Sequence, residues 1–160
     1  MYETLAVQAA RHPSESEERL VARVLAYALE YVDGIAFSSG GVSDPGEPAI
    51  AVRDLTGTMR VWIDVGTPDA ARLHKAAKAT PRVVVYTHKN PERLVANLKG
   101  ERIHRAEDVE IHAIDYRLID AIVARLDRRM AFALSIADRE LFLSIGTETL
   151  TGAVVRYPLE

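Results

Sequence analysis

The sequence predicts a single α/β domain in which a mixed β-sheet is flanked by helices and followed by a C-terminal antiparallel meander. Three observations lead to this prediction. The 160 residues fit one ordinary domain with one hydrophobic core. Helix-like and strand-like segments alternate through most of the chain, as they do in α/β proteins. From Met130 onward only strand-like segments follow one another, joined by short turns.

The first part of the chain is expected to be helical and then irregular. Residues 3–11 predict a short helix that ends before a proline, because the residue before proline avoids the α region. Ser14 and Glu17 have the spacing of a capping box. A longer amphipathic helix should therefore start at Ser14 and run to about Val32. The stretch 34–48 is rich in glycine, serine and proline and predicts a loop.

The middle of the chain predicts a hairpin and then alternating helices and strands. The helix after the hairpin has a strong start signal, with Thr67 as N-cap, Pro68 at the first helical position and Asp69 at the positive end of the helix dipole. The expected strands are 49–53, 60–66, 82–86 and 109–113, and the expected helices are 67–79, 91–98 and 116–126. The expected meander consists of strands 130–136, 140–144 and 150–157.

Composition limits the possible chemistry. The chain has no cysteine, which excludes disulfides, cysteine-bound zinc and thiol catalysis and allows a reducing cytoplasm, the expected location. Any metal site would use Asp, Glu, His or carbonyl oxygens, a ligand set that favours Mg²⁺ or Mn²⁺. The sequence has neither a signal-peptide pattern nor an apolar run of about 20 residues, so no membrane association is expected.

The charge balance argues against a protein that mainly coats nucleic acid. The net charge is −3, and the 20 lysines and arginines are spread along the chain, whereas backbone binding needs a basic surface. An enzyme that contacts only a few phosphates remains compatible with this composition.

Asp64 is the most informative polar residue. It lies near the end of a largely apolar strand and is followed at once by a helix N-terminus, where unpaired amides and the helix dipole favour ligands. The alternative is structural: Asp64 caps the following helix or pairs with a basic side chain on a neighbouring strand. Local pattern alone favours the structural role.

The other polar candidates have ordinary structural explanations. Glu17 is explained by the capping box, whereas Glu18 lies at the edge of the apolar helix face and could reach a site at the end of the sheet. Glu47 fits a turn, and Lys75 fits a solvated helix face. None of the five histidines forms a zinc motif, although His88 follows an apolar strand at its C-terminal end, where sheet sites gather.

Several blocks of residues resemble the bacterial YaeQ family in order and spacing across nearly the whole chain. They are residues 10–15 with Glu18-Arg19, Glu47-Pro48, 62–69, 72–76, Arg129-Met130 and 141–144. The resemblance implies a variant of the PD-(D/E)XK nuclease fold. It also implies that the chain lacks the strand with which relatives begin.

The resemblance further implies a site made of a helix glutamate, acids on two hairpin strands and a lysine. Carried over by position, the helix acid is Glu18, with Glu15 in the same block. The strand acid is Asp64, where relatives more often have glutamate. Lys75 would replace the lysine that ordinary nucleases keep two residues after the strand acid, where this sequence has Gly66.

A second departure concerns the other hairpin strand. Relatives commonly have an acid directly after Glu-Pro, where this sequence has Ala49. Glu47 or Asp54 is then expected to join Asp64 as a ligand of Mg²⁺ or Mn²⁺.

Two functions follow from the resemblance. The first is a Mg²⁺- or Mn²⁺-dependent phosphodiesterase acting on nucleic acid. In it Glu18 orients the metal's waters and Lys75 stabilises the attacking hydroxide or the charge of the transition state. The alternative is a catalytically degenerate nuclease-like fold that acts as a binding or regulatory module. Ala49 and Gly66 favour the alternative.

Overall fold

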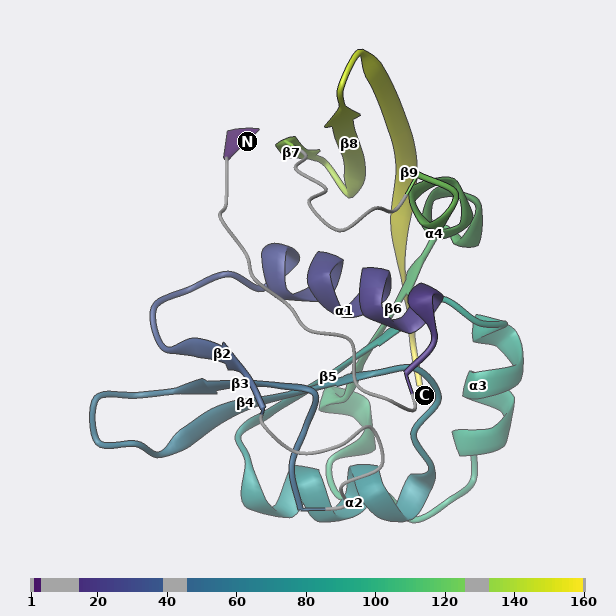
Figure 1. The fold of residues 1–160 in the computed structure, drawn as a ribbon. Helices are drawn as coiled ribbons and strands as arrows, with labels where there is room; N and C mark the ends of the chain where they lie inside the picture. The colour runs from purple at the N-terminus through teal and green to yellow at the C-terminus, as the bar shows by residue number, and fades with distance from the viewer. Residues whose placement is uncertain (1, 4–14, 39–45, 126–132, 160) are drawn as a thin grey trace.

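The structure is a computed structural model that describes residues 2–3, 15–38, 46–125 and 133–159. These residues form one nine-stranded mixed sheet in the order β1-β7-β8-β9-β6-β5-β4-β3-β2, with helices packed on it (Figure 1). The strands are β1 Tyr2–Glu3, β2 Ile35–Phe37, β3 Ile50–Arg53, β4 Met59–Val65, β5 Arg82–Thr87, β6 Glu110–Ile114, β7 Ala133–Ala137, β8 Glu140–Ile145 and β9 Glu148–Tyr157. The helices are α1 Glu17–Leu29, α2 Ala70–Ala79, α3 Pro91–Leu98 and α4 Tyr116–Val123, with a 3₁₀ turn at Ala106–Asp108.

The prediction of one α/β domain with a mixed sheet and a C-terminal meander is confirmed. β4, β5 and β6 are parallel neighbours at the centre of the sheet, and β7, β8 and β9 form the antiparallel meander. The parallel strands are joined through helices, as parallel strands must be. None of the helices in the described part of the chain is long and apolar enough to cross a bilayer.

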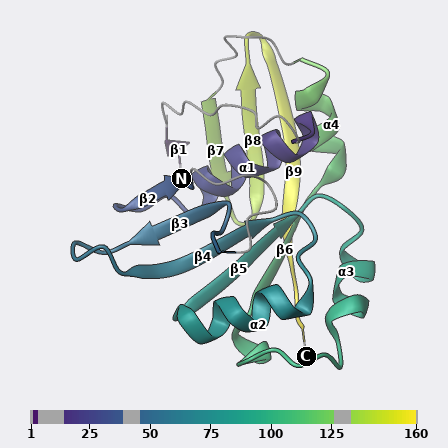
Figure 2. The same cartoon turned by 60° about the horizontal axis from the view of Figure 1, so that its bottom comes forward.

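The helices cover both faces of the parallel strands. On β5, Val84 and Tyr86 belong to the apolar cluster that includes α1 and α4, whereas Val83 and Val85 belong to the cluster that includes α2 and α3. This alternation follows from the pleat of a strand and explains the continuous apolar run of β5, which is buried on both faces. Figure 2 shows α2 on its own side of the strands and α1 on the other.

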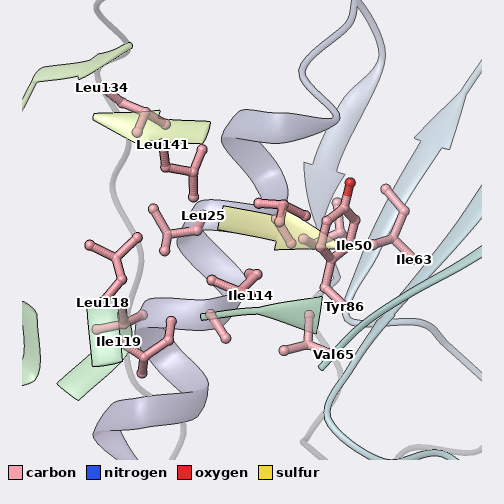
Figure 3. Packing of buried hydrophobic residues seen from close by; sticks show 14 of the residues in the cluster. Leu25, Ile50, Ile63, Val65, Tyr86, Ile114, Leu118, Ile119, Leu134 and Leu141 are labelled. Atoms are coloured by element: carbon pink, nitrogen blue, oxygen red, sulfur yellow. The ribbon is translucent and has the colours of Figure 1, made fainter. Parts of the chain in front are cut away.

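The larger apolar cluster surrounds α1, which lies inside the curl of the sheet (Figure 3). Leu25 is fully buried and lies between the hairpin residues Ile50 and Ile63 on one side and Leu118 and Leu141 on the other. Both halves of the sheet therefore pack on the same helix and share one apolar cluster.

β9 joins the two halves of the sheet. Its residues 148–153 pair with β8, and its residues 154–157 pair with β6. Gly152 lies beside the change of partner and directly under α4, where an added Cβ would lie 2.8 Å from the Cβ of Leu118. Glycine therefore allows the close approach of the strand to the helix.

Several element boundaries differ from the sequence predictions. Glu3 is in a strand rather than a helix, and the rest of the predicted helix 3–11, with the predicted cap Ser14, lies outside the described residues. The N-cap of α1 is Ser16, whose hydroxyl accepts a hydrogen bond from the Arg19 amide at 3.1 Å. Likewise, Asp69 rather than Thr67 caps α2.

The predicted loop 34–48 contains an unexpected strand. Ile35–Phe37 pairs antiparallel with residues 50–52 at the edge of the sheet. Gly34 makes this possible, because its φ is +93° and an added Cβ would lie 2.1 Å from the carbonyl oxygen of Arg53. Three residues that pair only at long range carry too little local signal to be predicted as a strand.

A charged network ties the C-terminus of α1 to the start of β5. Arg82 donates to Glu30 at 2.7 Å and to both carboxylate oxygens of Glu110 at 2.7 and 3.0 Å. Tyr86 also donates to Glu30, and the ring of His112 stacks on Tyr86 and lies 3.1 Å from Glu110. Burial alone would raise the pKa of Glu110, but hydrogen bonds from Arg82 and His112 outweigh it and lower this pKa to about 2.

This network predicts a loss of stability in acid. A carboxyl group whose folded pKa lies below its unfolded value of 4.5 contributes stability above 4.5, and that contribution is lost as the pH falls through about 2. We expect the free energy of unfolding to decline over this window and Glu110→Gln to reduce the decline. Urea unfolding at several pH values measures the effect, with the exposed Glu107→Gln as control. Equal slopes in both variants would contradict the prediction.

Candidate functional site

Asp64 is buried on the α2 face of β4 and is held by an arginine. Its neighbours Ile63 and Val65 belong to the cluster around α1, so the alternation of the strand directs Asp64 to the other face. There Arg72, in the first turn of α2, donates from Nε to Oδ2 at 2.8 Å and from Nη2 to Oδ1 at 3.0 Å. The pair is bidentate, and the Asp64 side chain is only 5% exposed.

The same guanidinium makes two further contacts. Its Nη2 donates to the backbone carbonyl oxygen of Glu47 at 2.6 Å, and its Cζ lies 5.2 Å from the centre of the Trp62 ring. A carboxylate, a carbonyl oxygen and an aromatic face thus surround one side-chain cation. The geometry matches the structural role considered for Asp64, which is an ion pair with a basic side chain. The partner lies on the following helix rather than on a neighbouring strand.

Ala49 lies directly before β3, at the Asp64 end of the hairpin. The antiparallel pairing of β3 and β4 ends with Ile50 opposite Ile63, and Ala49 packs against the apolar cluster around α1, which lies on the other face of the sheet from Asp64. The position after Glu47-Pro48 therefore carries a methyl group and offers no metal ligand.

Asp54, the other predicted metal ligand, lies in the turn at the opposite end of this hairpin from Asp64. Its carboxylate accepts hydrogen bonds from the Thr56 hydroxyl at 2.6 Å and from the Thr56 and Thr58 amides at 3.0 and 3.1 Å. These bonds, the Thr56 hydroxyl first, lower the pKa of Asp54. Asp54 therefore stabilises the turn of the hairpin and does not lie near Asp64.

The remaining predicted residues lie apart as well. Lys75 is exposed, one turn after Arg72 on α2. Glu18 is half-buried in the first turn of α1, on the other face of the sheet from Asp64. Within the described ranges, no three His, Asp or Glu side chains are grouped closely enough to hold a metal ion.

Glu15 is the buried acid of the first family-like block. It is 1% exposed and accepts hydrogen bonds from Nε and Nη2 of Arg23 at 3.0 and 2.9 Å, and from Arg19. Arg23 is itself buried and lies over the ring of Phe37. This pairing fixes the chain just before α1, which is a structural role.

A crevice opens at the C-terminal ends of β5 and β6 and was not predicted from the sequence. After β5 the chain crosses to α3 on one face of the sheet, and after β6 it crosses to α4 on the other. Ligand sites in α/β sheets gather where connections diverge in this way. The crevice has a volume of about 510 Å³, and its lining includes Glu18, His88, Lys89, Glu92, Tyr116 and Asp120.

His88 is the unusual residue of this crevice. Both of its ring nitrogens are shielded from solvent, and neither has a hydrogen-bond partner among the described residues. Burial, followed by the nearby charge of Lys89, lowers the pKa of His88, while Glu18 and Asp120 act in the opposite direction. The ring is therefore neutral near pH 7, with one nitrogen able to accept a hydrogen bond. Its place after an apolar strand was the sequence signal that could have singled it out.

The comparisons with known proteins all identify the same family. The family described as "YaeQ protein" matches residues 1–154. The chain is 27% identical to YaeQ of Escherichia coli K12 over 136 residues, which cover 84% of this chain and 75% of that protein. It is similar to the crystal structure of YaeQ from Xanthomonas axonopodis pv. citri, with 32% identity, a TM-score of 0.81, and coverage of 95% of this chain and 86% of that one. It is also similar to the crystal structure of YaeQ from Pseudomonas syringae, with 28% identity, a TM-score of 0.83, and coverage of 98% of this chain and 86% of that one.

Proposed function

The chain belongs to the YaeQ family, and from this premise we propose that it is a binding or regulatory module built on a variant of the PD-(D/E)XK nuclease fold. The observation that carries the proposal is the bidentate pair between Asp64 and Arg72. In a metal-dependent nuclease the strand acid binds a cation that activates water. Here a side-chain cation holds both oxygens of that acid.

Three further features support loss of catalysis. Ala49 carries no carboxylate, and Asp54 is engaged in a turn at the far end of the hairpin. Lys75, which would stabilise charge at the reacting phosphate, lies on the exposed side of α2. In this arrangement the residues do not fit a Mg²⁺ or Mn²⁺ ion, which takes about six oxygen ligands. The cysteine-free composition fits our further proposal that the module works in the cytoplasm.

A Mg²⁺- or Mn²⁺-dependent phosphodiesterase acting on nucleic acid is the second candidate, and one observation favours it. The Asp64 carboxylate and the Glu47 carbonyl oxygen converge on a single cation, the guanidinium of Arg72. Withdrawal of Arg72 would leave two oxygens facing the same point. This function then needs Arg72 to leave when metal and substrate bind.

Titration of Mn²⁺ into the purified protein separates the two functions. We expect wild type to show no stoichiometric binding at millimolar Mn²⁺, because the ion would have to displace a bidentate arginine. Isothermal calorimetry provides the measurement, and Asp64→Asn and Asp54→Asn are matched variants that each remove one carboxylate. Binding near one ion per chain that disappears in Asp64→Asn but persists in Asp54→Asn would favour the phosphodiesterase and contradict our proposal.

A further inference from the structure

The connection between α3 and β6 is held against α2 by a buried side chain and by an arginine. Ile103 is 8% exposed and belongs to the apolar cluster that includes α2 and α3. Arg105 has a left-handed φ of +50°, and its guanidinium donates to the carbonyl oxygens of Ala77 and Thr80 at 2.8 and 3.0 Å. These carbonyl groups lie at the C-terminus of α2, where a helix leaves such groups without partners. The connection is therefore fixed on the surface of α2.

This arrangement also fixes the imidazole of His74, which lies in the middle of α2. Its Nδ1 accepts a hydrogen bond from the backbone amide of His104 at 2.9 Å. Because Nδ1 is an acceptor, the proton of the neutral ring is on Nε2, which is then a donor. The rings of His74 and His104 also lie edge to face, with their centres 6.4 Å apart. The connection thus selects the tautomer in which His74 offers an N–H donor at neutral pH.

Among the described residues, the charges that act on His74 are all positive. Partial burial first, and then Arg102, Lys78 and His104, lower the pKa of His74. Lys78 lies one turn further along α2, and Arg102 and His104 are exposed on either side of the buried Ile103. Within the described ranges, none of these three side chains forms an ion pair. Cations from two segments distant in sequence therefore meet without a neutralising carboxylate.

The dipole of α2 does not account for this gathering of cations. A cation in the last turn of a helix is commonly explained by the negative end of the dipole, and Lys78 lies in that turn. Arg105, however, already donates to the carbonyl groups at this helix end. Arg102 and His104 lie outside the helix and are exposed. Like charges that are brought together repel one another, and a bound anion removes this repulsion.

We propose that the cluster of His74, Lys78, Arg102 and His104 binds the phosphate group of a phosphomonoester. Such a group has three terminal oxygens and a charge of roughly −1.5 to −2 near pH 7. The charge matches the two cations Lys78 and Arg102. The oxygens accept from the guanidinium, the ammonium group and the Nε2–H of His74. A carboxylate has only two oxygens and one charge, and it would leave part of this donor set unused.

The extent of the cluster favours a free small molecule over nucleic acid. Binding along a nucleic-acid backbone needs a stripe of basic residues that follows several phosphates. Here the cations surround one histidine, in a chain whose net charge is −3. The cluster shares no residue with the contacts of Asp64 and Arg72, so phosphate binding here goes beyond the proposed function and is tested separately from it.

Titration with methyl phosphate, a monoester, and dimethyl phosphate, a diester with one charge, tests the proposal. NMR of the histidine rings at constant ionic strength reports binding at His74 and His104. We expect methyl phosphate to shift both sets of signals and to saturate in the millimolar range, and dimethyl phosphate to bind at least about tenfold more weakly. Bound methyl phosphate should also raise the pKa of His74 by about half a unit or more, because its charge offsets that of the neighbouring cations.

Matched variants locate the binding. Lys78→Gln and Arg102→Gln each remove one positive charge at an exposed position and should each weaken methyl phosphate binding by about fivefold or more. Lys89→Gln removes the same charge from an exposed lysine at the opposite end of β5 from the C-terminus of α2. It should have less than about a twofold effect. Circular dichroism first checks that each variant is folded.

Four outcomes would overturn the proposal. The first is no response of His74 and His104 to methyl phosphate at tens of millimolar. The second is equal affinity for dimethyl phosphate. The third is equal weakening by Lys78→Gln and Lys89→Gln, which would indicate attraction to the whole surface. The fourth is saturation of the cluster by a short oligodeoxynucleotide at micromolar concentration while methyl phosphate leaves it unchanged, which would assign the cluster to nucleic acid.

Discussion

Replacing Asp64 with alanine is expected to lower the free energy of unfolding by about 3 kcal/mol, because it leaves the guanidinium of Arg72 without its carboxylate in a mostly buried position. The Arg72 side chain is 20% exposed, so water compensates only part of the loss. Truncation of one partner of a buried ion pair is costly mainly because the other charge remains. Urea denaturation, followed by circular dichroism, measures the change.

A double-mutant cycle isolates the pair itself. Arg72→Ala should destabilise the protein as well. The destabilisation of the double variant should be smaller than the sum of the two single destabilisations by about 1 kcal/mol or more. Lys75→Ala is the matched control, since it removes a cation from the same helix at an exposed position and should change stability by less than about 0.5 kcal/mol. A negligible coupling energy would mean that Arg72 does not hold Asp64 in solution.

Replacing Arg82 with alanine is expected to lower the free energy of unfolding by about 2–3 kcal/mol. The change leaves Glu30 and Glu110 facing each other with side chains only 11% and 18% exposed. The Arg82 side chain itself is 40% exposed, which is why the expected loss is smaller than for a fully buried pair. Thermal or urea unfolding provides the measurement.

The geometry of the Arg82 network supplies its own control. Arg82→Lys keeps the charge but cannot donate to both oxygens of Glu110 and to Glu30 at once, so it should recover only part of the stability. Arg93→Ala, at an exposed position on α3, should have little effect. If Arg82→Ala behaves like Arg93→Ala, the network does not hold α1 against the sheet.

Local sequence signals were enough to predict the parallel part of the fold. α3 begins and ends where predicted, because Asn90 caps it and Pro91 occupies its first position. β5 was predicted from its apolar run and extends one residue further, to Thr87. These signals lie within a few residues of one another and need no knowledge of the rest of the chain.

The start of α1 shows where local signals fail. Ser14 has an acid three residues later and Ser16 does not, so the capping-box rule favoured Ser14. In the structure Ser16 is the cap, and the intervening Glu15 is buried against Arg23, eight residues away. The cap therefore lies two residues later than the capping-box rule predicts, beside the ion pair of Glu15 with Arg23.

The candidate sites depend on contacts between different helices and strands, which the hydrophobic periodicity of the sequence does not reveal. Asp64 was singled out, but its partner Arg72 lies eight residues away on a different element. The crevice requires α1, α3, α4 and the connection after β5 to be placed in space first. Only the position of His88 at the end of an apolar strand pointed toward it from the sequence.

The double pairing of β9 has a consequence for how the protein folds during synthesis. On the ribosome the parallel strands and α1 emerge well before β9, and β6 must wait for a neighbour that lies some 40 residues further along the chain, since His112 pairs with Arg156. Until β9 emerges, the nascent chain exposes an unpaired edge of β6, and exposed edges invite pairing with other chains. The emergence of β9 is therefore the step that covers the edge of β6 and joins the two halves of the sheet.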